Sequence, residues 1–322
     1  MSHIAIAAIQ MRIHNADNRA VMIQRLETTM ALFPWVQLVL FSELAPFGAD
    51  PSRAVELPGP VEEQFQQIAR QHRIWLIPGS LYERRDGRIY NTAPIISPQG
   101  VVVDRYRKQF PFLPYEAGIA AGDRFVTFDV PDTGRIGVSI CYDMWFPETT
   151  RTLAAMGAEL ILHPSLTGTI DRDVELSIAR SSAVTNQCYF VDVNGLDAGG
   201  VGRSIIVGPA GDVLHVAGEA PEIIPIELDL GRVRRGRERG LRGLGQPLKS
   251  FRDRQVDFTL YRESPYDGYL GTLGRLEKPA RPGQVVHAPP AHEIAGPPSA
   301  EEPGEFVPAP IEVPVKGSSH GS

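Results

Sequence analysis

The chain has 322 residues, of which 43% are hydrophobic and 22% are charged, and its formal net charge is −6. This composition is typical of a soluble globular protein, and the acidic balance argues against nucleic acid or an anionic membrane as a partner. Two cysteines are too few for a disulfide scaffold. Because the N-terminus does not read as a signal peptide and no apolar window reaches membrane-span length, we expect a cytoplasmic protein.

Strand-length apolar runs alternate with helical stripes along most of the chain. Strands are expected at 3–10, 35–41, 74–83, 135–141, 158–165, 188–195 and 222–230, and hairpins at 90–106 and 202–217. Helices are expected at 17–33, 61–73 and 171–187, and from Pro147 to about Ala158. This alternation predicts an α/β layered fold with one mixed sheet, or with two packed sheets and helices outside.

Two segments near the C-terminus depart from this pattern. An arginine-rich run at 231–243 is interpreted as an exposed helix or turn, with a phosphate-binding patch as the alternative. Residues 277–322 are dense in proline and poor in large apolar side chains, so they form either an extended arm or a disordered tail. We therefore predict a domain over 1–276 followed by a Pro-rich C-terminal extension.

Three strand ends carry side chains that together have a chemical logic. The run 35–41 is followed by Glu43, the strand near residue 106 by Lys108, with Glu116 eight residues later, and the run before 141 ends on Cys141. Polar residues at the ends of strands converge on one crevice in open α/β sheets. Taken singly, a cysteine here is usually a core residue, a glutamate a helix cap and a lysine a solvated charge.

Together the three side chains supply a nucleophile, a general base and a cation. A thiol must lose its proton to attack carbon, a buried carboxylate can take that proton, and an ammonium can stabilise the anionic intermediate. No metal-binding motif is present, so neither a metal nor a cofactor is expected. Cys188 begins a strand without such neighbours and is interpreted as structural.

These stretches resemble the nitrilase superfamily of carbon–nitrogen hydrolases. "FSELAPFG", "YRKQFPFLPYEAG" and "GVSICYDMWFPE" match its glutamate, lysine and cysteine signatures in order, and the resemblance covers roughly Ile4 to Leu230. It implies a four-layer α-β-β-α sandwich in which Cys141 is the nucleophile, Glu43 the general base and Lys108 the stabiliser of the tetrahedral intermediate. It also implies that Glu116 helps to position the lysine, and that the protein forms a homodimer or a higher homo-oligomer.

The substrate is expected to be a small-molecule amide or N-carbamoyl compound, cleaved to a carboxylic acid plus ammonia or an amine. True nitrilases of this superfamily usually carry Cys-Trp-Glu, whereas this chain has Cys-Tyr-Asp, as the amidase and carbamoylase branches do. A nitrile is therefore the alternative substrate. The residues predicted to bind substrate, with the Tyr142 N–H completing the oxyanion site, are Tyr142, Trp145, His163, Arg180 and Tyr115.

Other interpretations stay open at this point. Arg180 either holds a substrate carboxylate or lies on a helix surface. His163 suggests a Cys–His pair of the papain type, which would leave Glu43 and Lys108 without a role. A non-catalytic scaffold protein and an acyltransferase using the same thioester are further alternatives.

Overall fold

The computed structural model describes residues 2–168, 171–254, 256–262 and 268–278. These residues form two large β-sheets. The first sheet has the order β16-β1-β2-β3-β5-β4, and β6 and β7 also pair with β5. Its strands are β1 (His3–Gln10), β2 (Leu38–Phe41), β3 (Trp75–Ile77), β4 (Leu81–Arg85), β5 (Arg88–Ile96), β6 (Val102–Arg107), β7 (Ile119–Ala120) and β16 (Glu222–Asp229).

The second sheet has the order β15-β14-β11-β10-β9-β8. Its strands are β8 (Val126–Val130), β9 (Gly134–Val138), β10 (Leu160–Ser165), β11 (Tyr189–Asn194), β14 (Ile205–Val207) and β15 (Val213–Val216). A small two-stranded sheet is formed by β12 (Leu196–Asp197) and β13 (Gly200–Val201). Parallel pairing of β1 with β2, and of β9, β10 and β11 with one another, brings several strand ends to the same edge.

Helices flank the sheets. The α-helices are α1 (Arg19–Leu32), α2 (Pro60–His72), α3 (Pro147–Ala155), α4 (Asp171–Asn186), α5 (Leu230–Arg239) and α6 (Pro247–Asp253). Short 3₁₀ turns are η1 (Pro51–Arg53), η2 (Cys141–Trp145), η3 (Thr259–Tyr261) and η4 (Tyr269–Leu273). Within the described ranges, every helix is too short or too polar to cross a bilayer.

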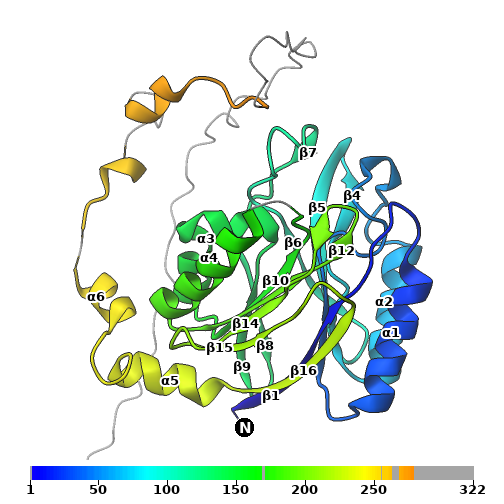
Figure 1. Cartoon of the computed structure of the whole chain (residues 1–322), viewed down its shortest axis with the longest axis horizontal. Helices are drawn as coiled ribbons and strands as arrows, with labels where there is room; N and C mark the ends of the chain where they lie inside the picture. The colour runs from blue at the N-terminus through cyan, green and yellow to red at the C-terminus, as the bar shows by residue number, and fades with distance from the viewer. Residues whose placement is uncertain (1, 169–170, 255, 263–267, 279–322) are drawn as a thin grey trace, which may run out of the picture. The chain divides into compact units, whose positions relative to one another are not determined.

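Three hydrophobic clusters define the layers. The largest lies between the two sheets and joins Leu40 and Ile6 of the first sheet to Val138 and Val191 of the second. A second cluster packs α1 and α2 against the outer face of the first sheet, and a third packs α3 and α4 against the outer face of the second. Figure 1 shows these helix pairs on opposite sides of the strands. The predicted α-β-β-α sandwich is confirmed.

The predicted elements agree with the structure apart from a few boundaries. The run 74–83 is divided into β3 and β4 by the turn Pro78–Ser80, because Gly79 adopts a φ of 77° that ends the strand. The structure adds β8, whose alternating residues leave one side partly open to solvent. The Pro-rich extension predicted from residue 277 lies almost wholly outside the described residues, so that domain boundary stays a prediction.

The arginine-rich run forms α5, and its guanidinium groups are engaged within the chain. Arg232 pairs with Asp212 at 3.0 Å and Arg234 with Glu159 at 2.7 Å. Arg237 donates to the backbone carbonyl groups of residues 158 and 187. These contacts fasten α5 onto the second sheet and favour the helix interpretation over a phosphate-binding patch.

Replacing a side chain between the sheets tests this layering. Leu40 is fully buried there, so Leu40→Ala is expected to lower the free energy of unfolding by about 3 kcal/mol, because the cavity it leaves cannot collapse fully. Urea unfolding followed by circular dichroism measures this. Leu32→Ala is the control, since Leu32 is 62% exposed and its loss is expected to change stability by less than about 0.5 kcal/mol. Equal losses in both variants would contradict the predicted core.

Candidate active site

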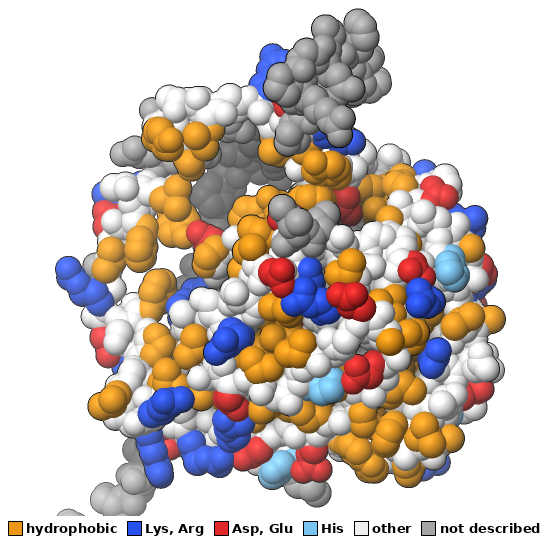
Figure 2. Space-filling model, viewed as in Figure 1, with side chains coloured by type: hydrophobic (Ala, Val, Ile, Leu, Met, Phe, Trp, Pro, Cys, Tyr) orange, Lys and Arg blue, Asp and Glu red, His pale blue; other side chains and the backbone are white. Residues whose placement is uncertain are grey.

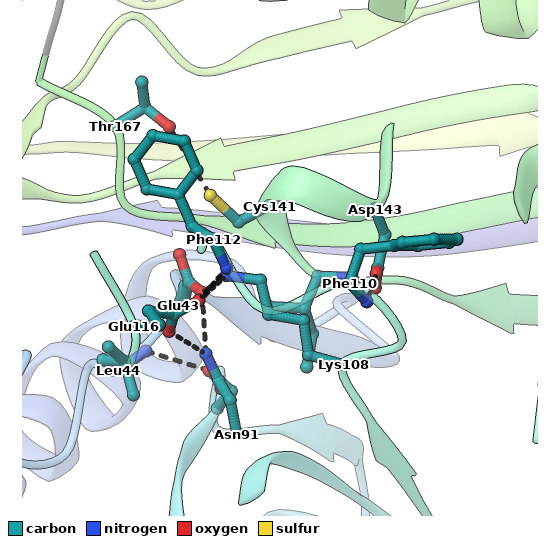
Figure 3. A network of polar contacts seen from close by, with 12 residues as sticks. Glu43, Leu44, Asn91, Lys108, Phe110, Phe112, Glu116, Cys141, Asp143 and Thr167 are labelled. Carbon is teal, nitrogen blue, oxygen red and sulfur yellow. Dashed lines mark hydrogen bonds and ion pairs between the residues drawn. The ribbon is translucent and has the colours of Figure 1, made fainter. Parts of the chain in front are cut away.

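The three predicted catalytic side chains converge at the strand ends. Glu43 lies just after β2, Lys108 directly after β6, and Cys141 just after β9. The Lys108 Nζ atom is 2.9 Å from Glu43 Oε1, and the Cys141 thiol lies close enough to the Glu43 carboxylate for the two groups to interact. Figure 3 shows the sulfur, the carboxylates and the ammonium group facing one another. The site is therefore built from the ends of both sheets.

Close backbone packing holds Glu43 in place. A Cβ atom added at Gly79 would lie only 1.8 Å from the Ser42 carbonyl oxygen, so the loop after β3 can approach this segment only because residue 79 is glycine. The next residue, Ser80, accepts a hydrogen bond from the Leu44 N–H at 3.1 Å. The residues on both sides of Glu43 are thus held by contacts with the loop after β3.

Cys141 has a left-handed backbone conformation, with a φ of 47°. This conformation is unfavourable for a residue with a side chain and needs support from its surroundings. Asp143 supplies it by accepting hydrogen bonds from the Ile140 N–H and the Tyr106 hydroxyl with one oxygen, and from the Phe110 N–H with the other. Burial raises the pKa of Asp143 to about 6, and these donors oppose that shift.

Glu116 and two residues without a predicted role complete the cluster. Glu116 Oε2 lies 2.8 Å from Lys108 Nζ and accepts from the Phe112 N–H at 2.6 Å. Asn91 donates to Glu43 Oε1 at 2.8 Å, and the Tyr82 hydroxyl donates to Glu116 at 3.3 Å. Asn91 lies within the part of the chain that resembles the superfamily, but nothing local distinguished its side chain from an ordinary strand residue.

The protonation states follow from burial and charge. Burial raises the pKa of Glu43 and outweighs the opposing effect of Lys108. Burial lowers the pKa of Lys108, but the neighbouring carboxylates, Glu43 above all, raise it well above its usual range. Burial raises the pKa of Glu116, yet Lys108 brings it below the usual value. Glu43 is therefore the carboxylate best placed to accept a proton.

The Cys141 thiol is protonated in the resting site. Burial, followed by the nearby Glu43 carboxylate, raises its pKa well above the usual value, and Lys108 only partly opposes this. A thiol in this state needs a base to remove its proton as it attacks. Glu43, the carboxylate that acts most strongly on this thiol, meets that need.

His163 does not have the predicted substrate-binding role. It is fully buried behind the nucleophile, where its Nε2 lies 3.1 Å from the Cys141 carbonyl oxygen and its Nδ1 lies 2.7 Å from Ser139 Oγ. Burial lowers its pKa to about 4, so the ring is neutral. With both nitrogens engaged elsewhere, neither is available to the sulfur, and the papain-type alternative loses its base.

The predicted aromatic residues form one cluster of rings that includes Tyr142, the residue after Cys141. Phe112 stacks on Tyr115 with ring centroids 4.9 Å apart and lies at the same centroid distance from Tyr142. Tyr142 in turn lies 6.2 Å from Trp145. The geometry is consistent with the predicted substrate-binding role of Tyr142, Trp145 and Tyr115.

Arg180 is the second correction to the predicted site. Its side chain is exposed on α4, and its Nε donates to the Gly211 carbonyl at 3.4 Å. It therefore corresponds to the helix-surface alternative. The buried arginine of α4 is Arg172, two turns earlier, because the inward face of this helix includes Arg172, Glu175 and Ala179.

A further polar group, absent from the sequence prediction, approaches the sulfur. The Thr167 hydroxyl lies 3.5 Å from Cys141 Sγ and donates to Glu175 Oε1 at 3.1 Å. Glu175 and Asp192 both pair with Arg172, at 3.1 and 2.7 Å. The spacing of Arg172 and Glu175 on α4 suggested an ordinary surface ion pair, and only the fold places it beside the nucleophile.

Comparison with known proteins identifies the family. The model of the carbon–nitrogen hydrolase family matches residues 5–238. The chain is 31% identical to human omega-amidase NIT2 over 233 residues, which cover 66% of this chain and 80% of that protein.

Two solved structures show the same architecture. Nit3 of Saccharomyces cerevisiae, a member of the nitrilase superfamily, is 29% identical with a TM-score of 0.68, covering 74% of this chain and 94% of that chain. A cysteine-to-alanine variant of the amidase from Nesterenkonia sp. AN1, in complex with butyramide, is 26% identical with a TM-score of 0.65, covering 72% and 94%. Because the family model spans well over half of the chain, this protein belongs to the carbon–nitrogen hydrolase family, within the nitrilase superfamily.

Proposed function

We propose that this protein is a thiol amidase that converts a small amide to a carboxylic acid and ammonia. The observation that carries this proposal is the contact of one carboxylate, Glu43, with both the Cys141 thiol and the Lys108 ammonium. The amide preference is supported by the Cys-Tyr-Asp sequence at residues 141–143, and by relatives named as an omega-amidase and an amidase.

In the acylation half, the Cys141 sulfur attacks the amide carbon and its proton passes to Glu43. The oxyanion that forms is stabilised by the Lys108 ammonium and by the Tyr142 N–H, since charge stabilisation is strong in a buried site. Glu43 then gives its proton to the leaving nitrogen, the carbon–nitrogen bond breaks, and ammonia departs. The acyl group remains on the sulfur as a thioester.

In the deacylation half, water attacks the thioester carbon while Glu43 takes a proton from that water. The carbon–sulfur bond breaks, the proton returns to the sulfur, and the carboxylic acid leaves. Glu116 is not needed as a second base. Lys108 lowers the pKa of Glu116, so the Glu116 carboxylate stays ionised and accepts a proton only weakly. Its role is to position Lys108, together with the hydrogen bonds from Asn91 and Tyr82.

We further propose that the protein works as a homodimer or a higher homo-oligomer. Among its described residues, the segment from Leu244 to Leu276 exposes ten large apolar side chains, more than an isolated surface segment needs (Figure 2). These are Leu244, Phe251, Val256, Phe258, Leu260, Tyr261, Tyr269, Leu270, Leu273 and Leu276. A second copy is the proposed partner that covers them, as expected from the superfamily.

A reducing compartment such as the cytoplasm suits this chemistry. Both cysteines are free and buried in the structure. Because thiols survive as reagents where glutathione and thioredoxin keep them reduced, we propose a cytoplasmic location.

Removing the nucleophile is the first test. Cys141→Ala is expected to reduce ammonia release from small amides to the uncatalysed background, because no other group in the site can form the thioester. Ammonia is measured over a panel of amides and nitriles, and mass spectrometry of the unmodified enzyme looks for an acyl adduct on Cys141. The matched control is Cys188→Ala, which removes a buried thiol away from the site and should keep turnover. Unchanged activity in Cys141→Ala would exclude the mechanism.

The base is tested by pH dependence. Only ionised Glu43 can accept the proton, so kcat/KM should fall as the pH drops through the raised pKa of Glu43, above the ordinary glutamate value of about 4.3. Glu43→Gln should lower kcat/KM by roughly 10²–10⁴-fold and remove this acid limb. Thermal unfolding of the variant checks that it folds. An acid limb that survives in Glu43→Gln would assign the base to another group.

The oligomer is tested by truncation. Ending the chain after Gly243 removes the exposed apolar segment, and the mass measured by light scattering should fall to that of a monomer. Ending it after Leu276 removes only the Pro-rich extension and separates the two contributions. If neither truncation changes the mass, the segment does not form the interface.

A further inference from the structure

Glu175 occupies a place beside the nucleophile that the catalytic cycle does not use. Its Oε1 atom accepts from the Thr167 hydroxyl at 3.1 Å and from the Trp145 indole N–H at 3.3 Å. Thr167 touches the Cys141 sulfur at 3.5 Å, and Trp145 belongs to the predicted substrate-binding wall. Glu175 therefore contacts a predicted substrate-binding residue directly and lies one side chain away from the thiol.

The charges around Glu175 do not cancel. Arg172, from the same helix, pairs with Glu175 at 3.1 Å and with Asp192 of β11 at 2.7 Å, and donates to the Arg203 carbonyl at 2.7 Å. These three charged side chains are at least 97% buried. Two carboxylates thus face one guanidinium, and this side of the crevice carries an excess of negative charge when both carboxylates are ionised.

The residue expected to hold a substrate carboxylate supplies no compensating cation here. Arg180, predicted as the candidate for holding a substrate carboxylate, is exposed and bonded to Gly211. On the opposite side of the thiol, Lys108 is already shared between Glu43 and Glu116. An amide that also carries a carboxylate would therefore be repelled by the buried negative charge. Salt and water screen this repulsion little, because the charged groups are buried.

We propose that Glu175 determines the charge specificity of the enzyme, disfavouring amides whose acyl chain ends in an anion and favouring neutral or cationic acyl chains. This inference rests on the proposed amidase function and narrows its substrate class. Glu175 is a positioning residue in this scheme, since Thr167 and Trp145 stand between it and the substrate. It acts through its charge and through the direction of the Thr167 hydroxyl.

The effect should depend on pH. Burial, followed by repulsion from Asp192, raises the pKa of Glu175 to about 7, and Arg172 and the Trp145 donor oppose this. The carboxyl is therefore neutral below about pH 7 and charged above it. Discrimination against an anionic substrate should grow as the pH rises through this value, because only the ionised form repels the substrate.

Three amides of matched length test the proposal: butyramide, γ-aminobutyramide and the monoamide of glutaric acid. They carry a neutral, a cationic and an anionic end. In the unmodified enzyme, kcat/KM for butyramide and for γ-aminobutyramide should each exceed that for the glutaric monoamide by roughly tenfold or more at about pH 8. The preference should shrink toward about pH 6.

Glu175→Gln keeps the acceptor for Thr167 and Trp145 but removes the charge. It should reduce the neutral-to-anionic ratio by roughly tenfold at about pH 8 and make the ratio independent of pH. Glu63→Gln, on the exposed face of α2, is the matched control and should leave the ratio as it is. If Glu175→Gln does not fold, Asp192→Asn replaces it as the test. This variant should reduce the neutral-to-anionic ratio by less than Glu175→Gln would. The ratio should also change at a lower pH, because removing the Asp192 charge removes a repulsion that raises the pKa of Glu175.

Two results would overturn the proposal while leaving the amidase function intact. They are a preference of the unmodified enzyme for the glutaric monoamide, and an unchanged ratio in an active Glu175→Gln enzyme. If no amide is hydrolysed, the proposed function fails instead. Calorimetry then measures how the same amides bind to Cys141→Ala, with and without Glu175→Gln, so the charge preference is tested without turnover. Equal affinity of Cys141→Ala for all three amides would overturn the proposed charge specificity.

Discussion

A buried ammonium group is the interaction on which the site depends. Lys108 is only 1% exposed, and removing such a charge from water without compensation costs several kcal/mol. Glu43 and Glu116 compensate it at 2.9 and 2.8 Å. Because two carboxylates surround one cation, one of them keeps a high proton affinity. That excess suits the general base of the proposed mechanism, in a place that water hardly reaches.

The site exists only while the two sheets stay packed. Glu43 and Lys108 follow strands of the first sheet, whereas Cys141 follows a strand of the second. The core between the sheets therefore determines the distance between base and nucleophile. The buried hydrogen bond from the Tyr106 hydroxyl to Asp143 spans the same gap at 2.6 Å, and ties the nucleophile turn to the strand that carries Lys108.

The fold and the convergence of three polar side chains at strand ends could be predicted because both leave local patterns. Alternating strand runs and helical stripes reveal the layers, and Glu43, Lys108 and Cys141 each follow an apolar run. Other residues left no such pattern. Arg180 and Arg172 lie on the same helix, and only packing against the second sheet decides that Arg172 is buried and Arg180 exposed. His163 follows an apolar run much as Cys141 does, yet its ring faces the backbone rather than the sulfur.

Charge conservation explains why a dry site suits this chemistry. Proton transfer from the Cys141 thiol to Glu43 moves a negative charge from the carboxylate to the sulfur without creating one, so no new ion must be desolvated. The negative charge then passes to the substrate oxygen. Lys108 is already ionised and can stabilise that charge. A second substrate anion would break this balance, because Glu175 and Asp192 already exceed the charge of Arg172. Under the proposed specificity, two separate groups of buried charges therefore divide the work: Glu43 and Lys108 serve the chemistry, and the cluster around Arg172 disfavours a second substrate anion.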